Sequence, residues 1–162
     1  LGSEFVFQMD ADLSHDPQYL KPMLEAAEGN DVVIGSRYTD SRISVVNWPL
    51  RRLVLSVFAN YYVRTITRMP VHDATSGFRC WRPTALRMLN LESIRSDGYS
   101  FQVETLYRAY CLGLRITEVP IVFVERRTGS SKMSKRVILE SAIMPWRLTL
   151  SRFLGRIKGP AR

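Results

Sequence analysis

With 162 residues and 46% hydrophobic side chains, the chain is long enough for one domain with a buried core. Its net charge of +8 lies at one end: residues 126–162 carry 10 Lys and Arg against 1 acidic residue, whereas residues 1–125 carry 13 against 14. Because this charge gathers on one terminal segment and not along a groove with stacking aromatics, we expect no nucleic-acid partner.

Short apolar strands alternate with helical segments along the chain, which is typical of an α/β sheet. The predicted elements are, in chain order, strand 4–9, helix 17–28, strand 31–35, helix 49–67, a short strand 77–81, helix 83–90, helix 100–112 and strand 118–124. Asp16 can cap the first helix, with Pro17 in its first turn, and Gly113 ends the helix before the last strand. We therefore predict an α/β fold. The chain does not begin with methionine, and we expect it to be the later part of a longer protein.

The segment 135–162 is predicted to be a basic amphipathic helical tail. Apolar side chains recur at helical spacing in it: Leu139, Ile143, Trp146, Leu150, Phe153 and Ile157. Pro145 is expected to kink the helix. Such a helix either lies in the interface of an anionic membrane leaflet or packs on a half of the domain that we expect to be missing from this chain.

Cys80 and Cys111 lie 31 positions apart without a CxxC motif or a nearby histidine at metal-ligand spacing. We expect neither zinc nor a disulfide, but two small buried residues in a reducing compartment. The longest run without charge, residues 53–63, is far shorter than the ~20 apolar residues that a transmembrane helix needs. No membrane span or signal peptide is predicted.

The stretch "FQMDADLSHDP" places two carboxylates, Asp10 and Asp12, at the end of the first predicted strand. In extended backbone alternate side chains share a face, so the two can point together while Ala11 turns away. A hard cation such as Mg²⁺ relieves their repulsion and is usually held by one or two carboxylates plus substrate phosphates. The alternative is a pair of turn carboxylates. Ser14 and His15 either touch a metal or substrate or are solvated turn residues.

Six segments, taken in order, resemble successive motifs of the polyprenyl-phosphate (dolichol-phosphate) mannosyltransferases, which are inverting glycosyltransferases of the GT-A fold. They read "QMDADLSHDP", "DVVIGSRY", "NWPLRR", "DATSGFR", "GYSFQVE" and "ERRTGSSKMS". The resemblance implies a Rossmann-like GT-A catalytic domain in residues 1–134. It also implies that the N-terminal half that binds the nucleotide base in this family is missing from the chain.

The resemblance implies a role for each matched position. Asp10 and Asp12 would hold Mg²⁺ or Mn²⁺, and Ala11, Arg126 and Lys132 would bind the donor. Arg37, Arg52 and Ser56 would bind the acceptor phosphate, with Asp10, Asp12, Arg37 and Asp73 as the catalytic set. From the residues alone, Arg37 follows a strand at the carboxyl edge of the sheet, and Arg52 and Ser56 share one helix face; surface positions are the alternative.

Asp73 has the chemistry of a general base, which many inverting glycosyltransferases need. A phosphate acceptor changes that need, because a phosphate monoester is already largely ionised at pH 7. We therefore expect Asp73 to orient the site or its loop. Glu104 either organises the same loops or forms a structural salt bridge.

The function predicted is transfer of mannose from GDP-mannose to polyprenyl or dolichyl phosphate with inversion, by a peripheral protein on the cytoplasmic face of a membrane. The enzymatic alternative uses UDP-glucose or another UDP-sugar. The alternative outside the enzymes is a membrane-surface module whose basic tail binds anionic lipid.

Overall fold

The structure is a computed structural model of residues 1–162, and it describes all of them except residues 1, 40–41, 95, 125–134 and 158–162. The predicted Arg126 and Lys132 lie outside the described residues. Within the described part, no helix is long and apolar enough to cross a membrane.

A mixed four-stranded sheet forms the centre of the molecule, with the strand order β1-β4-β2-β5. Its strands are β1 (Val6–Gln8), β4 (Arg79–Trp81), β2 (Val32–Ser36) and β5 (Ile116–Pro120). β4 runs antiparallel to both β1 and β2, whereas β2 and β5 run parallel. A separate two-stranded parallel sheet pairs β3 (Val45–Val46) with β6 (Phe123–Val124).

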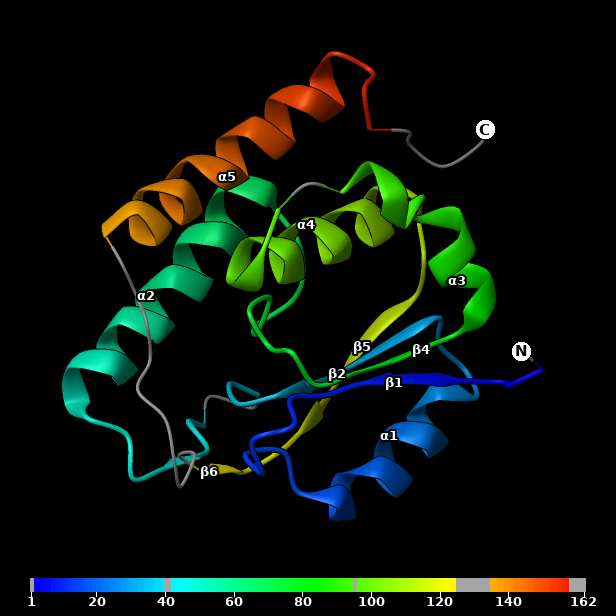
Figure 1. The fold of residues 1–162 in the computed structure, drawn as a ribbon, viewed down its shortest axis with the longest axis vertical. Helices are drawn as coiled ribbons and strands as arrows, with labels where there is room; N and C mark the ends of the chain where they lie inside the picture. The colour runs from blue at the N-terminus through cyan, green and yellow to red at the C-terminus, as the bar shows by residue number, and fades with distance from the viewer. Residues whose placement is uncertain (1, 40–41, 95, 125–134, 158–162) are drawn as a thin grey trace.

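Helices cover both faces of this sheet, as Figure 1 shows: α1 lies on one side, and α3 and α4 lie on the other with α5 stacked beyond α4. The helices are η1 (Pro17–Tyr19), α1 (Leu20–Ala27), α2 (Leu50–Thr67), α3 (Pro83–Met88), η2 (Leu91–Ser93), α4 (Gly98–Cys111) and α5 (Lys135–Phe153). The alternation along β2 explains the layering, because Val32 and Ile34 join the cluster under α2 to α5 while Val33 joins the cluster under α1. The two cores therefore share one central strand.

The helix ends follow the local signals of the sequence. The Asp16 side chain accepts a hydrogen bond from the backbone N–H of Gln18 and caps η1. At the end of α4, Gly113 adopts a φ of 75°, and the N–H groups of Gly113 and Leu114 bond to the carbonyls of Tyr110 and Ala109. This pattern is a Schellman motif, which needs a residue with positive φ.

The structure confirms the predicted α/β class, the short strand near 77–81 and every predicted helix, with shifted ends. The predicted strand 118–124 is instead two strands that belong to two different sheets. β3 and η2 were not predicted, because two or three residues carry no periodic pattern. Cys80 and Cys111 are free and buried, as expected.

The tail helix packs on the core through residues outside its predicted apolar stripe. Met144 and Leu148 are the α5 residues that enter the core beside α2 and α4. Most of the predicted apolar stripe stays exposed, including Trp146, at 60%, and Phe153, at 87%. Pro145 lies inside the helix, and the expected kink stays a prediction.

The centre of the larger core gives a test of the fold. Leu106 on α4 is fully buried, so Leu106→Ala should lower the free energy of unfolding by about 2–5 kcal/mol. Leu24→Ala on α1, where the side chain is 42% exposed, should cost well under half as much. Urea unfolding followed by far-UV circular dichroism measures both, and equal losses would contradict the core assignment.

Candidate active site

The carboxylate pair lies in a turn and not in extended backbone. β1 ends at Gln8, and Leu13 has a φ of 64°, so the chain reverses directly after the pair. Oδ1 of Asp12 accepts hydrogen bonds from the backbone N–H of Ser14, at 3.1 Å, and from its hydroxyl, at 2.5 Å. This closes an Asx-type turn, so the expectation of a shared strand face is wrong. Asp10 is exposed, and its carboxylate lies beside Gly77, where a Cβ atom would sit 3.4 Å from Oδ1.

His15 fixes this turn from inside the protein. Its side chain is almost fully buried, with the ring stacked on Phe78 and edge-on to Phe123. Nδ1 accepts a hydrogen bond from the backbone N–H of Asp10 at 3.0 Å. Burial lowers the pKa of His15, against the opposing charges of Asp10 and Asp12. A neutral imidazole with a free lone pair on Nδ1 therefore orients the backbone at Asp10.

Asp10 and Asp12 present the hard carboxylate oxygens that Mg²⁺ and Mn²⁺ prefer. No described residue donates a hydrogen bond to the Asp10 carboxylate, which leaves its oxygens available to a cation. Among the described residues there is no group of three or more His, Cys, Asp or Glu side chains placed to hold a metal. The pair therefore fits a cation that takes its remaining ligands from substrate phosphates and water, and not one held in a closed protein site.

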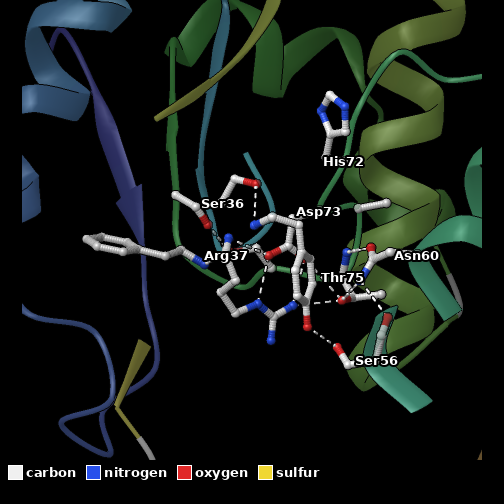
Figure 2. A network of polar contacts seen from close by, with 12 residues as sticks. Ser36, Arg37, Ser56, Asn60, His72, Asp73 and Thr75 are labelled. Carbon is white, nitrogen blue, oxygen red and sulfur yellow. Dashed lines mark hydrogen bonds and ion pairs between the residues drawn. The ribbon is translucent and has the colours of Figure 1, made fainter. Parts of the chain in front are cut away.

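A buried ion pair between Arg37 and Asp73 forms the centre of the polar network in Figure 2. Nε and Nη2 of Arg37 each lie 2.7 Å from one Asp73 oxygen, and the Arg37 backbone N–H donates to the same carboxylate at 3.0 Å. Arg37 is 6% exposed and Asp73 is fully buried. Burial alone would lower the pKa of Arg37, but the charge and hydrogen bonds of Asp73 outweigh it, so the pKa is raised.

The network extends from this pair to α2. Nη2 of Arg37 also donates to the Thr75 hydroxyl at 2.8 Å, and Asn60 Nδ2 donates to the same hydroxyl at 3.0 Å. Burial raises the pKa of Tyr38, and its protonated hydroxyl donates to Ser56 Oγ at 2.7 Å. The end of β2 is thereby tied to the face of α2 that carries Ser56 and Asn60.

Glu118 on β5 supports the segment that carries Asp73. One carboxylate oxygen accepts from the backbone N–H of Asp73 at 2.9 Å. The other oxygen accepts from the backbone N–H of His72 and contacts its Nδ1, both at 2.9 Å. Because β5 pairs with β2, a single carboxylate locks the Asp73 segment to the strand beside Arg37.

Arg79 holds the same loop, at residues 74–76, from inside the protein. Its guanidinium is fully buried and donates to the carbonyls of Ser76 and Ala74, both at 3.0 Å, and to the Thr105 hydroxyl at 2.9 Å. Burial lowers the pKa of Arg79, and Asp73 opposes that effect. Arg79 therefore holds the loop through its backbone carbonyls.

A pocket of about 270 Å³ opens beside the ion pair, between α2, α4 and α5. Its polar end brings together the three residues predicted to bind the acceptor phosphate, Arg37, Arg52 and Ser56. The rest of the wall is mainly apolar: Leu55, Phe58, Tyr62, Val63, Val103, Ala142 and Met144. Tyr62 closes one side, because its hydroxyl donates to the Ala142 carbonyl at 2.7 Å and accepts from Trp146 Nε1 at 2.9 Å.

The turn and the pocket are neighbours. His15 contacts the Asp10 backbone on one side and Phe123 on the other, and Phe123 packs edge-on against Trp48 in the pocket wall.

Glu104 forms an ion pair with Arg108 and accepts a hydrogen bond from the Ser96 hydroxyl, which matches the predicted alternative of a structural salt bridge. Sequence reasoning missed the supporting roles of Glu118, Arg79 and His15, because their partners are backbone groups or rings that no motif records.

The Arg37–Asp73 pair gives a test of the site's architecture. Asp73→Asn should lower the free energy of unfolding by about 3–5 kcal/mol, since it leaves the Arg37 charge buried without its counter-charge. His72→Ala, next in sequence but half exposed, should cost at most about 1 kcal/mol. Chemical denaturation of both variants measures this, and a near-wild-type midpoint for Asp73→Asn would show that the pair does not hold the site together.

Comparisons with known proteins place this geometry in context. The chain is 42% identical over 142 residues to an undecaprenyl-phosphate mannosyltransferase of Micrococcus luteus, covering 88% of this chain and 58% of that protein. It is 41% identical over 162 residues to a polyprenol monophosphomannose synthase of Mycolicibacterium smegmatis, covering 99% of this chain and 61% of that protein. The chain thus spans about three fifths of the length of these curated relatives.

The fold is similar to a solved structure as well. The glucosyl-3-phosphoglycerate synthase of Mycobacterium tuberculosis, solved with phosphoglyceric acid, aligns with a TM-score of 0.55 and 18% identity over 99% of this chain and 52% of that one. This likeness supports the predicted GT-A-like α/β fold. The family model for glycosyl transferase family 2 matches residues 2–89, which include the carboxylate turn, Arg37 and Asp73. The chain therefore belongs to glycosyl transferase family 2.

Proposed function

We propose that the protein transfers mannose from GDP-mannose to a polyprenyl monophosphate with inversion at the anomeric carbon. The observation that carries the proposal is the pocket with two arginines at one end and an apolar wall beyond them, adjacent to a carboxylate turn. The names of the two curated relatives, a polyprenol monophosphomannose synthase and an undecaprenyl-phosphate mannosyltransferase, support the mannosyl group and the polyprenyl phosphate acceptor in this proposal.

The pocket matches the two chemical parts of a lipid phosphate. Arg37 and Arg52 supply positive charge, and the Ser56 hydroxyl, which accepts from Tyr38, keeps its own hydrogen for a phosphate oxygen. Beyond them, Phe58, Val63 and other apolar side chains offer a surface for the first isoprene units. A free sugar would leave most of this wall without a partner.

The arrangement around Asp73 supports attack by an already ionised acceptor. Both Asp73 oxygens are engaged by Arg37 in a fully buried ion pair, so this carboxylate is not placed to take up a proton. A phosphate monoester with a second pKa near 6 is largely dianionic at pH 7 and needs no base. In the proposed step its oxygen forms a bond to the anomeric carbon while the bond from that carbon to the GDP β-phosphate oxygen breaks. Asp73 acts here as a positioning residue for Arg37.

The carboxylate turn is assigned to the donor. Asp10 and Asp12 would hold Mg²⁺ or Mn²⁺, which would neutralise the diphosphate and the charge on the departing GDP. Asp12 is kept in place by Ser14, and the backbone of Asp10 is kept in place by His15. Arg126, Lys132 and the Ala11 backbone are proposed to contact the donor, as the resemblance implies. A turn fixed in advance in this way reduces the cost of ordering the site when the donor binds.

A peripheral position on the cytoplasmic face of a membrane is proposed from the exposed surface of α2 and α5. Exposed apolar side chains gather on both helices: Leu50, Val54, Leu55, Phe58, Tyr61, Leu139, Ile143, Trp146, Leu150 and Phe153. Phe58 and Leu55 also line the pocket, so this surface and the pocket are continuous. Adjacent basic residues on α5, such as Arg147 and Arg152, suit an anionic leaflet.

The donor sugar is tested by a transfer assay with the full-length protein, polyprenyl phosphate and Mg²⁺. GDP-mannose is expected to be used at least about 100-fold more efficiently than UDP-glucose, measured as kcat/KM for radiolabelled lipid product. A preference for UDP-glucose would replace the proposed reaction by its closest enzymatic alternative. Vesicle binding without transfer of either sugar would favour the lipid-binding module.

The metal assignment predicts that Asp10→Ala and Asp12→Ala each lower kcat/KM by about 100-fold or more, because several kcal/mol of charge stabilisation are lost. Asp16→Asn, four positions after Asp12, removes one carboxylate charge but keeps a side-chain oxygen that can cap η1, so it should change kcat/KM by less than about threefold. Excess EDTA should abolish transfer by the wild-type protein, and Mg²⁺ or Mn²⁺ should restore it. Transfer that persists in EDTA would remove the metal from the proposal.

The acceptor assignment predicts that substitution of Arg52 weakens acceptor binding, whereas substitution of its neighbour Arg51 does not. Arg52→Ala should raise the KM for polyprenyl phosphate by about 10- to 100-fold, the loss expected for a charge-assisted hydrogen bond, with the KM for GDP-mannose nearly unchanged. Arg51→Ala removes an equal charge from the exposed side of the same helix turn and should change either KM by less than about threefold. Equal effects of the two substitutions would contradict a specific acceptor site.

A further inference from the structure

Trp48 lies between the two arginines of the pocket. The Arg52 guanidinium carbon is 4.1 Å from the centre of the Trp48 ring system, and that of Arg37 is 5.4 Å from it. Phe123 packs edge-on against the same indole with ring centroids 5.5 Å apart. Trp48 lines the pocket together with both arginines, so all three groups face one space.

This position lets one aromatic ring contact both guanidinium groups of the pocket. Arg37 and Arg52 carry like charges at one end of a mainly apolar cavity, and Arg37 is almost fully buried. The face of an indole ring is negative and attracts both guanidinium groups, and tryptophan gives the strongest such contact among the aromatic residues. Asp73 balances the charge of Arg37, and Trp48 is the group that touches both cations.

The indole N–H of Trp48 has no hydrogen-bond partner among the described residues. Nε1 is buried, and no described residue accepts a hydrogen bond from it. It is the only buried side-chain nitrogen or oxygen without a hydrogen bond among the described residues. A buried donor without an acceptor is costly and usually marks a function or a bound group.

The backbone that follows adds to the positive potential around Trp48. α2 begins at Leu50, with Pro49 as its N-cap, and no side chain caps its first N–H groups. No acidic residue occupies its first turn. An uncapped helix N-terminus carries a partial positive charge, so the surroundings of the indole favour an anion.

We propose that Trp48 is a binding residue for the acceptor phosphate: its ring holds Arg37 and Arg52 in one anion site, and its Nε1–H donates a hydrogen bond to a phosphate oxygen of the lipid. This inference rests on the proposed function for the identity of the anion as a polyprenyl phosphate. The proposed contact concerns binding of the acceptor and does not depend on which sugar is transferred.

The test measures binding to the full-length protein in detergent by isothermal titration calorimetry, without a sugar donor. The ligands are polyprenyl phosphate, the uncharged polyprenol of the same length, inorganic phosphate and GDP. Trp48→Phe keeps an aromatic face and removes the N–H. Replacement of Trp48 by benzothienylalanine keeps the bicyclic ring and has sulfur in place of the N–H, so it tests the donor with little change in packing. Trp48→Leu removes both the donor and the ring face.

The expected result is an affinity for polyprenyl phosphate that falls by about tenfold in Trp48→Phe and in the benzothienylalanine variant, and by about 100-fold in Trp48→Leu. The weaker binding of inorganic phosphate should fall by a similar factor in the first two variants, which identifies the phosphate as the group contacted. GDP and polyprenol should bind these two variants as they bind the wild-type protein. The thermal unfolding midpoint of the benzothienylalanine variant should stay within about 3 °C of wild type.

Three results would overturn the inference: unchanged affinity of the benzothienylalanine variant for polyprenyl phosphate, an equal loss for polyprenol, or an equal loss for GDP. A different result would reject the proposed function and keep this inference: the wild-type protein would bind polyprenyl phosphate in a Trp48-dependent manner without transferring mannose to it. Mannose transfer by a wild-type protein whose lipid phosphate affinity is insensitive to Trp48 would instead reject this inference and keep the function.

Discussion

The ion pair between Arg37 and Asp73 is the interaction on which the rest of the site depends. It joins the end of β2 to the loop before β4, and each partner needs the other because both are buried. Pairs of this kind seldom add much net stability, but they fix one geometry, because a displaced partner leaves a charge without compensation. Glu118 and Arg79 then fix the loop backbone on either side of Asp73. The charged end of the pocket is thereby rigid before any ligand arrives.

Sequence reasoning predicted the positions of Arg37, Asp10 and Asp12 after their strands, whereas their roles stay predictions. Arg37 directly follows the buried strand β2, and Asp10 and Asp12 follow the edge strand β1, so their place at one edge of the sheet could be predicted from strand pattern and turn residues. The pairing of Arg37 with Asp73 could not, because 36 positions separate them and a carboxylate in a loop has many candidate partners. The same limit explains Glu118, whose hydrogen bonds go to backbone N–H groups, which every sequence offers equally.

Local patterns carry limited information in two places. The apolar stripe of α5 marks a face without saying what covers it, and in the structure Trp146 and Phe153 of that stripe are exposed. Met144 and Leu148, which the stripe did not include, pack inward. The strand face predicted for the carboxylate pair is wrong, because Leu13 adopts a positive φ that β-strand alternation does not anticipate. Its turn depends on Ser14 and His15, which a D-x-D pattern treats as neutral spacers.

The walls of the pocket come from three helices that are distant in the sequence, so the pocket is completed late during synthesis of the chain. α2 and α4 precede α5, which supplies Ser141, Ala142 and Met144 to the cavity. During synthesis the carboxylate turn and the Arg37–Asp73 pair can form as soon as β5 has left the ribosome, whereas the cavity closes only after residue 148 has emerged. At typical elongation rates of about 5–20 residues per second, a nascent chain therefore exposes this positively charged, partly apolar surface for roughly 1–6 s. Translation of α5 then adds the remaining wall of the pocket to this partly folded intermediate.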